Sequence, residues 1–388
     1  MVRRDRAPAY LLNVFSSFEM GGAQVRFAAI ANHFGRHYRH SIMAMDGNYA
    51  NVARLRPDLD VTIETLPPSR GTLTNRRNFR AVLRSRQPSC LITYNWGAIE
   101  WAMANVPNLV RHIHIEDGFG PEESDRQLLR RVLARRLLLR RSTVVVPSRK
   151  LESIATGIWK LSRSSVRYIP NGIDCARFSQ TGISSLPERD GRLTIGTVAA
   201  LRAEKNLVRM MDAFRLVRER CDCRLVIAGD GPVRAELEAY SAKLGLAPHV
   251  TFTGNRTDVE RVYAALDIFL LSSDTEQMPT AVIEAMASGL PVVATDVGDV
   301  AGMVARENAP FVVPMDANAL ARATLSLLAD ESLRRRVGAE NRIRALRKYS
   351  DTAMFAAYGE LFEPDGTGAR THLPGVALTP QVQPIDRS

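Results

Sequence analysis

Two residue patterns alternate along most of this chain: short apolar runs rich in β-branched residues, and longer segments whose apolar residues recur at helical spacing. Strands that alternate with helices of roughly 10–15 residues are typical of parallel sheets joined by right-handed crossovers. We therefore expect an α/β fold. Strands are expected in the first half at 10–15, 41–45, 61–65, 90–94, 110–115, 143–146 and 166–169. In the second half they are expected at 193–198, 224–228, 250–253, 267–271 and 291–294.

Helical patterns fill most of the intervals between these strands, and the whole alternation starts again near residue 190. In the first half the helices are expected to end near Phe34 and to cover 76–86 and 124–139. In the second half they are expected to begin at Asn206, Pro232, Asp258 and Thr280. The polar stretch 181–192, which contains Gly, Pro and Ser, is typical of a linker between two domains.

This restart predicts two α/β domains of similar size, at residues 1–185 and 186–345. A helix at 346–363 is expected to pack back toward the first domain. Residues 364–388 contain Pro and Gly but no long periodic segment, so we expect a disordered tail. A chain of 388 residues with 45% hydrophobic residues can bury a sizeable core, which excludes a disordered, collagen-like or disulfide-framed miniprotein.

Nothing in the sequence predicts a disulfide frame, a metal site or a membrane span. Of the four cysteines, Cys221 and Cys223 are two apart, and no second Cys or His pair at ligand spacing accompanies them. We expect reduced thiols. The N-terminus is a poor match to a signal peptide, and no window holds about 18 uninterrupted apolar residues. The sequence therefore favours a cytoplasmic protein.

The positive charge is concentrated in the first half of the chain. The net charge is +11, and residues 1–185 hold 28 basic and 14 acidic residues. Such asymmetry indicates an anionic partner, either nucleic acid or a membrane surface. Much of the excess lies in 124–141, from Ser124 to Arg141, where seven arginines alternate with leucine and valine.

A basic amphipathic helix of this kind is typical of binding to an anionic membrane surface. The alternative is a solvated helix that packs one face on its own sheet. Nucleic acid is not expected as a partner, because no aromatic stacking platform or nucleic-acid motif accompanies the arginines.

The most specific candidate site contains two glutamates, Glu276 and Glu284, with seven residues between them. Glu276 lies in the loop after an apolar strand, and Glu284 lies one turn into the next helix. In a parallel sheet this loop lies at the carboxyl edge, where ligands bind, and the helix start near Thr280 offers free N–H groups to an anion. Two carboxylates there could accept hydrogen bonds from sugar hydroxyls. The alternative is a capping loop with a solvated glutamate.

With the residues that follow it, A-M-A-S-G-L-P-V-V-A-T, this segment resembles the retaining glycosyltransferases of family 4 (glycosyltransferase group 1), which have the GT-B fold. Other segments resemble this family in the same order along the chain. They are Gly21-Gly22-Ala23, V-P-S at 146–148, I-P-N-G-I-D at 169–174, L-R-A-E-K-N at 201–206, I-A-G-D-G-P at 227–232 and G-N-R-T-D-V at 254–259. The ordered set covers roughly residues 10–362.

The resemblance implies two Rossmann-like domains that face each other across a cleft, with a nucleotide-sugar donor held mainly by the second. It implies that Glu276 contacts the transferred sugar, Glu284 the donor ribose and Lys205 the diphosphate. It implies a front-face reaction that retains the anomeric configuration. No D-x-D motif appears in the second half, so no obligatory metal and no cofactor besides the donor substrate are expected.

The remaining site predictions also follow from the resemblance. His114 is predicted to contact the donor and Asp117 to orient the acceptor or sugar; the alternative for His114 is a half-buried structural histidine. Arg202 is predicted to replace the arginine that the family has at the position of Ala200. The other residues predicted to bind substrate are Gly21, Gly22, Asn171, Gly229, Arg256, Met278, Pro279 and Thr280.

The sequence thus predicts a retaining glycosyltransferase that moves a sugar from a UDP- or GDP-sugar to a glycan or lipid-linked acceptor. Exopolysaccharide or lipopolysaccharide assembly at the inner face of the cytoplasmic membrane is the expected setting. Three alternatives stay open: an inverting GT-B enzyme, a nucleotide-sugar epimerase, and a catalytically inactive GT-B scaffold in which Ala200 and Gln277 replace family residues.

Overall fold

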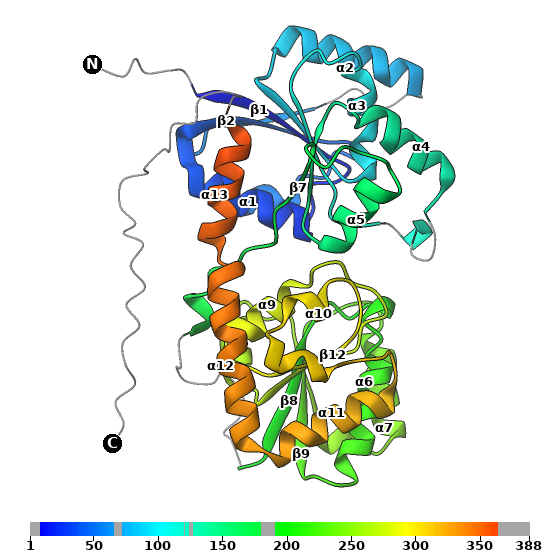
Figure 1. Ribbon diagram of the computed structural model, residues 1–388, viewed down its shortest axis with the longest axis vertical. Coiled ribbons are helices and arrows are strands. Elements are labelled where there is room, and N and C mark those ends of the chain that lie inside the picture. The colour runs from blue at the N-terminus through cyan, green and yellow to red at the C-terminus, as the bar shows by residue number, and fades with distance from the viewer. Residues whose placement is uncertain (1–7, 66–71, 120, 124–126, 180–190, 364–388) are drawn as a thin grey trace, which may run out of the picture.

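Two parallel β-sheets, one in each half of the chain, organise the structure (Figure 1). The computed structural model describes residues 8–65, 72–119, 121–123, 127–179 and 191–363. The first sheet has the strand order β3-β2-β1-β4-β5-β6-β7, and the second has the order β10-β9-β8-β11-β12-β13. Neighbouring strands in both described sheets run parallel. The predicted pair of Rossmann-like sheets is therefore confirmed.

The N-terminal domain is built on the seven-stranded sheet. Its strands are β1 (Ala9–Phe15), β2 (Tyr38–Ala44), β3 (Val61–Glu64), β4 (Cys90–Tyr94), β5 (His112–Ile115), β6 (Thr143–Val146) and β7 (Val166–Tyr168). Its helices are α1 (Gly22–Phe34), α2 (Thr72–Arg86), α3 (Ile99–Ala104), α4 (Leu129–Leu138) and α5 (Arg149–Gly157). The steps from β1 to β2 and from β2 to β3 run opposite to the steps from β3 onward. Right-handed crossovers therefore place α1 on one face and α2 to α5 on the other.

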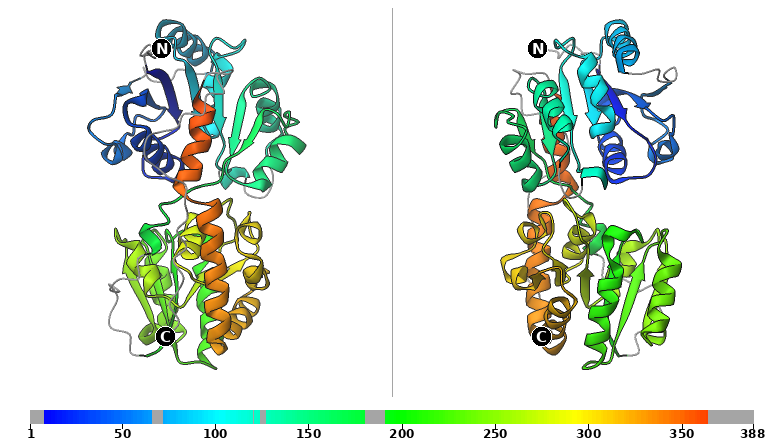
Figure 2. Two further views of the ribbon diagram at one scale, coloured as in Figure 1. Left: turned by 60° about the vertical axis from the view of Figure 1, so that its left-hand side comes forward. Right: turned by 90° about the vertical axis from the view of Figure 1, so that its right-hand side faces the viewer.

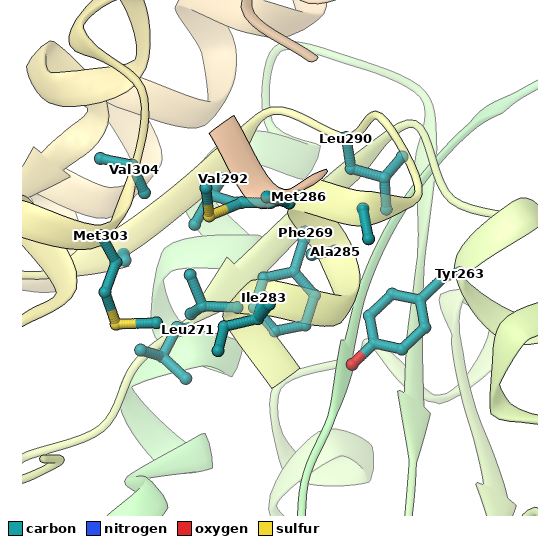
Figure 3. Close-up of a cluster of buried hydrophobic side chains, with 14 of the residues drawn as sticks. Tyr263, Phe269, Leu271, Ile283, Ala285, Met286, Leu290, Val292, Met303 and Val304 are labelled. Atoms are coloured by element: carbon teal, nitrogen blue, oxygen red, sulfur yellow. The ribbon is translucent and has the colours of Figure 1, made fainter. Parts of the chain in front are cut away.

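The C-terminal domain is built on the six-stranded sheet. Its strands are β8 (Leu193–Val198), β9 (Cys223–Ala228), β10 (Val250–Gly254), β11 (Ile268–Leu271), β12 (Val292–Thr295) and β13 (Val312–Val313). Its helices are α6 (Leu207–Arg218), α7 (Arg234–Lys243), α8 (Val259–Ala264), α9 (Thr280–Ala287), α10 (Val300–Met303), α11 (Ala317–Ala329) and α12 (Glu331–Lys348). Figure 3 shows Ile283 and Met286 of α9 in one buried cluster with Phe269 and Leu271 of β11.

The last described helix, α13 (Asp351–Phe362), crosses back to the N-terminal domain (Figures 1 and 2). Phe355 and Tyr358 belong to the same buried cluster as Phe27 of α1. The two segments that cross between the domains are bonded to each other. The Ile173 N–H donates to the Tyr349 carbonyl at 2.9 Å, and the Asp351 N–H donates to the Ile173 carbonyl at 2.9 Å.

Several expected boundaries differ from those observed. β2 begins three residues earlier than expected, because Tyr38 and His40 are also buried. α2 begins at Thr72 rather than at residue 76. α4 begins only at Leu129, because residues 121–123 form a 3-10 turn whose Glu123 carboxylate accepts the Leu128 N–H at 3.1 Å. Most of the expected linker at 181–192, the expected tail at 364–388 and Ser124 to Arg126 lie outside the described residues.

Candidate active site

Two loops at the carboxyl edge of the second sheet lie side by side because β8 and β11 are neighbouring strands. The loop after β8 contains a 3-10 turn at Ala203–Lys205, and the loop after β11 covers residues 272–279. The Ser272 hydroxyl donates to the Lys205 carbonyl at 2.9 Å, and the Asp274 N–H donates to the Glu204 carbonyl at 2.9 Å. These bonds fix the position of Lys205 relative to the second loop.

The side chains of Lys205 and Glu276 form an ion pair at the centre of this edge. The Lys205 Nζ to Glu276 Oε1 distance is 2.6 Å, and the two side chains are 23% and 10% exposed. The Ser273 hydroxyl also donates to Glu276 Oε1, at 2.8 Å. An ammonium group and a carboxylate are thus held together where both remain accessible. Such a pair can offer a cation to a phosphate and an acceptor to a hydroxyl.

Glu284 lies in the middle of α9, half-buried and bonded to a buried tyrosine. The Tyr263 hydroxyl donates to Glu284 Oε2 at 2.8 Å. Burial raises the pKa of Glu284, and the Tyr263 hydrogen bond and Arg177 act in the opposite direction. Glu284 is the only charged residue in α9 and is well placed to accept hydrogen bonds from a polar ligand.

The turn that follows β12 supports the loop that carries Glu276. Gly298 has a φ of +59°, and a Cβ at this position would overlap the carbonyl oxygen of Glu276. The Asp299 N–H donates to the Gln277 carbonyl at 3.0 Å. Only glycine combines this backbone conformation with such a close approach.

The predicted residues Met278, Pro279 and Thr280 end this loop and begin α9. Met278 is buried, Pro279 is the N-cap and Thr280 is exposed. The Asn171 amide Nδ2 donates to the Met278 carbonyl at 3.2 Å. The predicted residue Asn171, which follows β7, is therefore in direct contact with the loop of the other domain.

Arg26 was not identified from the sequence, yet it connects two of the predicted N-terminal residues, Asn171 and Asp117. Its Nη1 donates to Asn171 Oδ1 at 2.8 Å, and its Nη2 lies 2.6 and 2.8 Å from the two Asp117 carboxylate oxygens. Burial alone lowers the pKa of Arg26, but the Asp117 carboxylate outweighs it and raises that pKa well above its ordinary value. The only signal in the sequence is a charged residue within the apolar face of α1, between Ala23 and Phe27.

The structure places His114 inside the N-terminal domain, fully buried on β5, with its polar contacts to Thr93 and Glu116 of the same domain. Its Nδ1 lies 2.8 Å from the Thr93 hydroxyl, and its Nε2 lies 3.6 Å from Glu116 Oε2. His112 bonds to the same Thr93 hydroxyl at 2.9 Å, and burial lowers the pKa of His112 to about 3. The two histidines share one strand face, as expected, but that face is an interior one. The geometry thus fits the alternative of a structural histidine.

The other predicted residues lie at the same edges of the two sheets. Gly21 is the N-cap of α1 and Gly22 its first residue, at the carboxyl end of β1. Arg202 is exposed just before the Lys205 turn. Gly229 has a φ of +134°, and a Cβ there would overlap the Ala199 carbonyl, so its glycine is required by the backbone. Arg256 is bonded to Asp258 of its own loop at 2.7 Å.

Further contacts join the two domains next to Glu276. The Ser148 hydroxyl donates to Gln277 Oε1 at 3.4 Å. The Asp299 carboxylate accepts from the N–H of Arg149 and from the N–H of Lys150, the latter at 3.0 Å. A carboxylate of the C-terminal domain thus caps α5 of the N-terminal domain.

The part of the chain that the structure describes offers neither a metal site nor a membrane-spanning helix. Within these residues, no group of three or more His, Cys, Asp or Glu side chains is arranged to hold a metal ion. None of the described helices is both long and apolar enough to cross a bilayer.

Comparison with known proteins relates these features to a family. The sequence model of the family described as "Glycosyltransferase Family 4" matches residues 20–177, and that described as "Glycosyl transferases group 1" matches residues 180–344. EpsF of Bacillus subtilis is 29% identical over 58% of this chain and 62% of its own length. The lipopolysaccharide core biosynthesis glycosyltransferase LpsE of Rhizobium meliloti is 34% identical over 35% of this chain and 41% of its own length. The chain thus matches less than two thirds of either relative.

A solved structure with a similar fold is that of the Anabaena protein HepE in complex with UDP. It superposes with a TM-score of 0.77 at 19% identity, covering 91% of this chain and 99% of that one. This similarity extends through both parallel-sheet domains.

Proposed function

The chain belongs to the glycosyltransferases of group 1, and from this premise we propose that it is a retaining enzyme that transfers a sugar from a UDP- or GDP-sugar to a glycan or lipid-linked acceptor. The observation that carries the proposal is the Lys205–Glu276 pair, 2.6 Å apart at the carboxyl edge of the second sheet. Glu284 lies in the helix that follows the same loop.

These three side chains match the parts of a nucleotide-sugar. Lys205 would bind the diphosphate, Glu276 the hydroxyls of the transferred sugar and Glu284 those of the ribose. As the bond from the anomeric carbon to the diphosphate breaks, negative charge develops on the departing phosphate. A cation at this position stabilises the transition state more than the bound donor, which is what accelerates the reaction.

In the proposed front-face reaction, the acceptor oxygen bonds to the anomeric carbon on the face that the diphosphate leaves. The acceptor hydroxyl proton passes to the departing phosphate oxygen, so no protein nucleophile is consumed. We assign to Glu276 the interaction with the positive charge that develops on the sugar ring, because it is the carboxylate paired with Lys205. An inverting enzyme or an epimerase would give a different product, and NMR of the anomeric proton distinguishes them.

We place the enzyme in polysaccharide or lipopolysaccharide assembly at an anionic membrane surface. The name of LpsE supports this setting, and the arginine-rich segment that contains α4 supports the membrane. The UDP bound to HepE supports a uridine nucleotide in the donor.

The test compares turnover and nucleotide binding in matched variants. Lys205→Ala and Glu284→Ala should each lower turnover of the preferred nucleotide-sugar by more than about tenfold, while the exposed-residue controls Lys243→Ala and Glu236→Ala should not. Calorimetry with UDP and GDP identifies the base. Near-native turnover in both site variants would refute the donor-site assignment, and no binding of either nucleotide would favour the inactive scaffold.

A further inference from the structure

Three leucines of α4 point to solvent along one side of the helix. Leu129, Leu133 and Leu137 are 77%, 56% and 71% exposed. Their spacing of four residues places them above one another on a single face. Figure 1 shows α4 on the outer flank of the N-terminal domain, away from α13. A contiguous row of exposed leucines is unusual on a soluble surface and indicates an interaction site.

The arginines of the same segment fall into two groups. Arg135 is fully buried and pairs with Glu116 and Glu123 at 3.1 Å, and Arg131 pairs with Glu122 and Glu123. The other group is exposed and lies on the leucine side or directly after the helix: Arg130, Arg136, Arg140 and Arg141. The inward group is thus neutralised by its own domain, whereas among the described residues the outward group forms no ion pair.

Acidic residues are absent from the stretch of chain that holds the exposed group. Between Gln127 and Leu151 the chain contains no Asp or Glu. On a helix with 3.6 residues per turn, Arg130 lies on one side of the leucine row and Arg136 on the other, and Arg140 and Arg141 follow directly after α4 ends at Leu138. The result is a narrow apolar row with guanidinium groups along both sides.

We propose that this surface docks on an anionic lipid bilayer. We call it the leucine–arginine face, and it consists of residues of α4 and the two arginines that follow it: Leu129, Arg130, Leu133, Arg136, Leu137, Arg140 and Arg141. The leucines enter the headgroup layer, and the arginines bind lipid phosphates. This proposal refines the membrane setting of the proposed function and names the residues that contact the lipid. An apolar row between cations is the arrangement that interfacial helices use.

The positive charge of the leucine–arginine face favours an anionic bilayer over a second copy of the chain as its binding partner. In a symmetric dimer the face would meet itself, and the four arginines would lie against four identical arginines. An anionic headgroup layer instead neutralises each of them. A second arginine-rich helix, α2, lies on the same side of the sheet and exposes Leu73, Arg76 and Arg77.

Docking in this way also orients the candidate active site. The chain enters α4 from the carboxyl edge of the first sheet, after β5 and the Asp117 loop, and leaves it toward β6. The start of α4 therefore lies toward the edge that carries Asp117, and a lipid-held acceptor would reach that edge from the bilayer.

The experiment measures co-sedimentation of the full chain with phosphatidylcholine vesicles that contain or lack phosphatidylglycerol. The native protein should bind the phosphatidylglycerol vesicles and lose this binding at high salt. The variant Leu129→Ser/Leu133→Ser/Leu137→Ser should bind at least about tenfold more weakly. The variant Arg130→Gln/Arg136→Gln/Arg140→Gln/Arg141→Gln should also bind the vesicles at least about tenfold more weakly. Each arginine contributes at most roughly fivefold to the binding constant.

Matched controls carry the same changes on exposed residues of the C-terminal domain. They are Met315→Ser/Ile343→Ser/Leu346→Ser and Arg306→Gln/Arg335→Gln/Arg336→Gln/Arg347→Gln. Binding by the controls but not by the α4 variants supports the proposal. Equal binding by all of them overturns it, as does an α4 variant that converts a dimer to a monomer in sedimentation. UDP or GDP binding, measured on the same samples, tests the proposed function separately, because α4 contains none of the donor residues.

Discussion

Replacing the buried Arg135 by methionine should destabilise the N-terminal domain without weakening vesicle binding. The Arg135 guanidinium is 0% exposed, donates to Glu116 and Glu123, and lies 5.0–5.2 Å from the ring centres of Trp96, Phe119 and Trp159. Methionine is apolar, flexible and of similar length, so it can fill the space between the rings. The change in stability of this variant therefore reports mainly the loss of the guanidinium charge and of its bonds to Glu116 and Glu123.

The structure sets the size of the effect through the two carboxylates that remain. Glu123 keeps Arg131 at 3.0 Å and the Leu128 N–H at 3.1 Å. Among the residues that the structure describes, Glu116 keeps only His114 Nε2 at 3.6 Å, which is too long for a hydrogen bond, and its Oε1 has no hydrogen-bond partner even before the substitution. Stranding one buried carboxylate costs about 3–5 kcal/mol. With a urea m value of about 2–3 kcal/mol/M, the midpoint should fall by about 1–2.5 M.

Urea unfolding followed by tryptophan fluorescence measures this shift, because two of the three aromatic rings next to the Arg135 guanidinium belong to tryptophans. The neighbouring exposed Arg136→Gln should change stability by no more than about 0.5 kcal/mol. Adding Glu116→Gln to Arg135→Met should restore at least about 1 kcal/mol, since a neutral amide is cheaper to bury. Native stability in Arg135→Met, together with weaker vesicle binding, would show that this arginine faces the membrane and not the core.

Two further substitutions test the donor side. Glu284→Gln should raise the free energy of unfolding at neutral pH, because burial raises the pKa of Glu284 in the folded protein and its charged form is therefore penalised above that pKa. The gain should disappear as the pH falls below 4.5, the ordinary pKa of a glutamate, because Glu284 is then protonated in both the folded and the unfolded protein. If urea titrations show a gain that does not depend on pH, the buried charge of Glu284 is not its cause. Gly298→Ala should cost about 1–3 kcal/mol and lower turnover, since its Cβ meets the Glu276 carbonyl at a φ of +59°. Gly302→Ala, whose Cβ would meet nothing within 4 Å, is its control, and equal stability of the two variants would argue against the close approach.

The donor side could be predicted from sequence because each part of it is local. Glu276, Thr280 and Glu284 lie within one loop and the first turns of one helix, and alternating strands and helices place that loop at the sheet edge. Lys205 lies in the loop after a predicted strand. The sequence does not show that β8 and β11 are neighbouring strands. The contact between Lys205 and Glu276 depends on this pairing and therefore appears only in the structure.

The N-terminal side was harder to predict because its contacts span the chain. His114 lies on β5, which has β4 and β6 on either side, so a polar side chain on that strand can point into the interior. Arg26 acquires its role from Asp117 and Asn171, which are 91 and 145 residues away. Arg135 looks like the other arginines of its helix, and only Glu116, Glu123 and three aromatic rings from other segments distinguish it.

Residues of both domains contact the loop that carries Glu276, so both domains together form the candidate active site. Asn171 binds the Met278 carbonyl, Ser148 binds the Gln277 side chain, and Asp299 joins the Gln277 carbonyl to α5. A rotation of one domain would have to break these side-chain bonds, whereas the backbone bonds between Ile173 and the Tyr349–Asp351 segment lie where the chain crosses and can persist. The connections keep the domains together, and the side-chain contacts beside Glu276 fix how the N-terminal domain faces the donor loop.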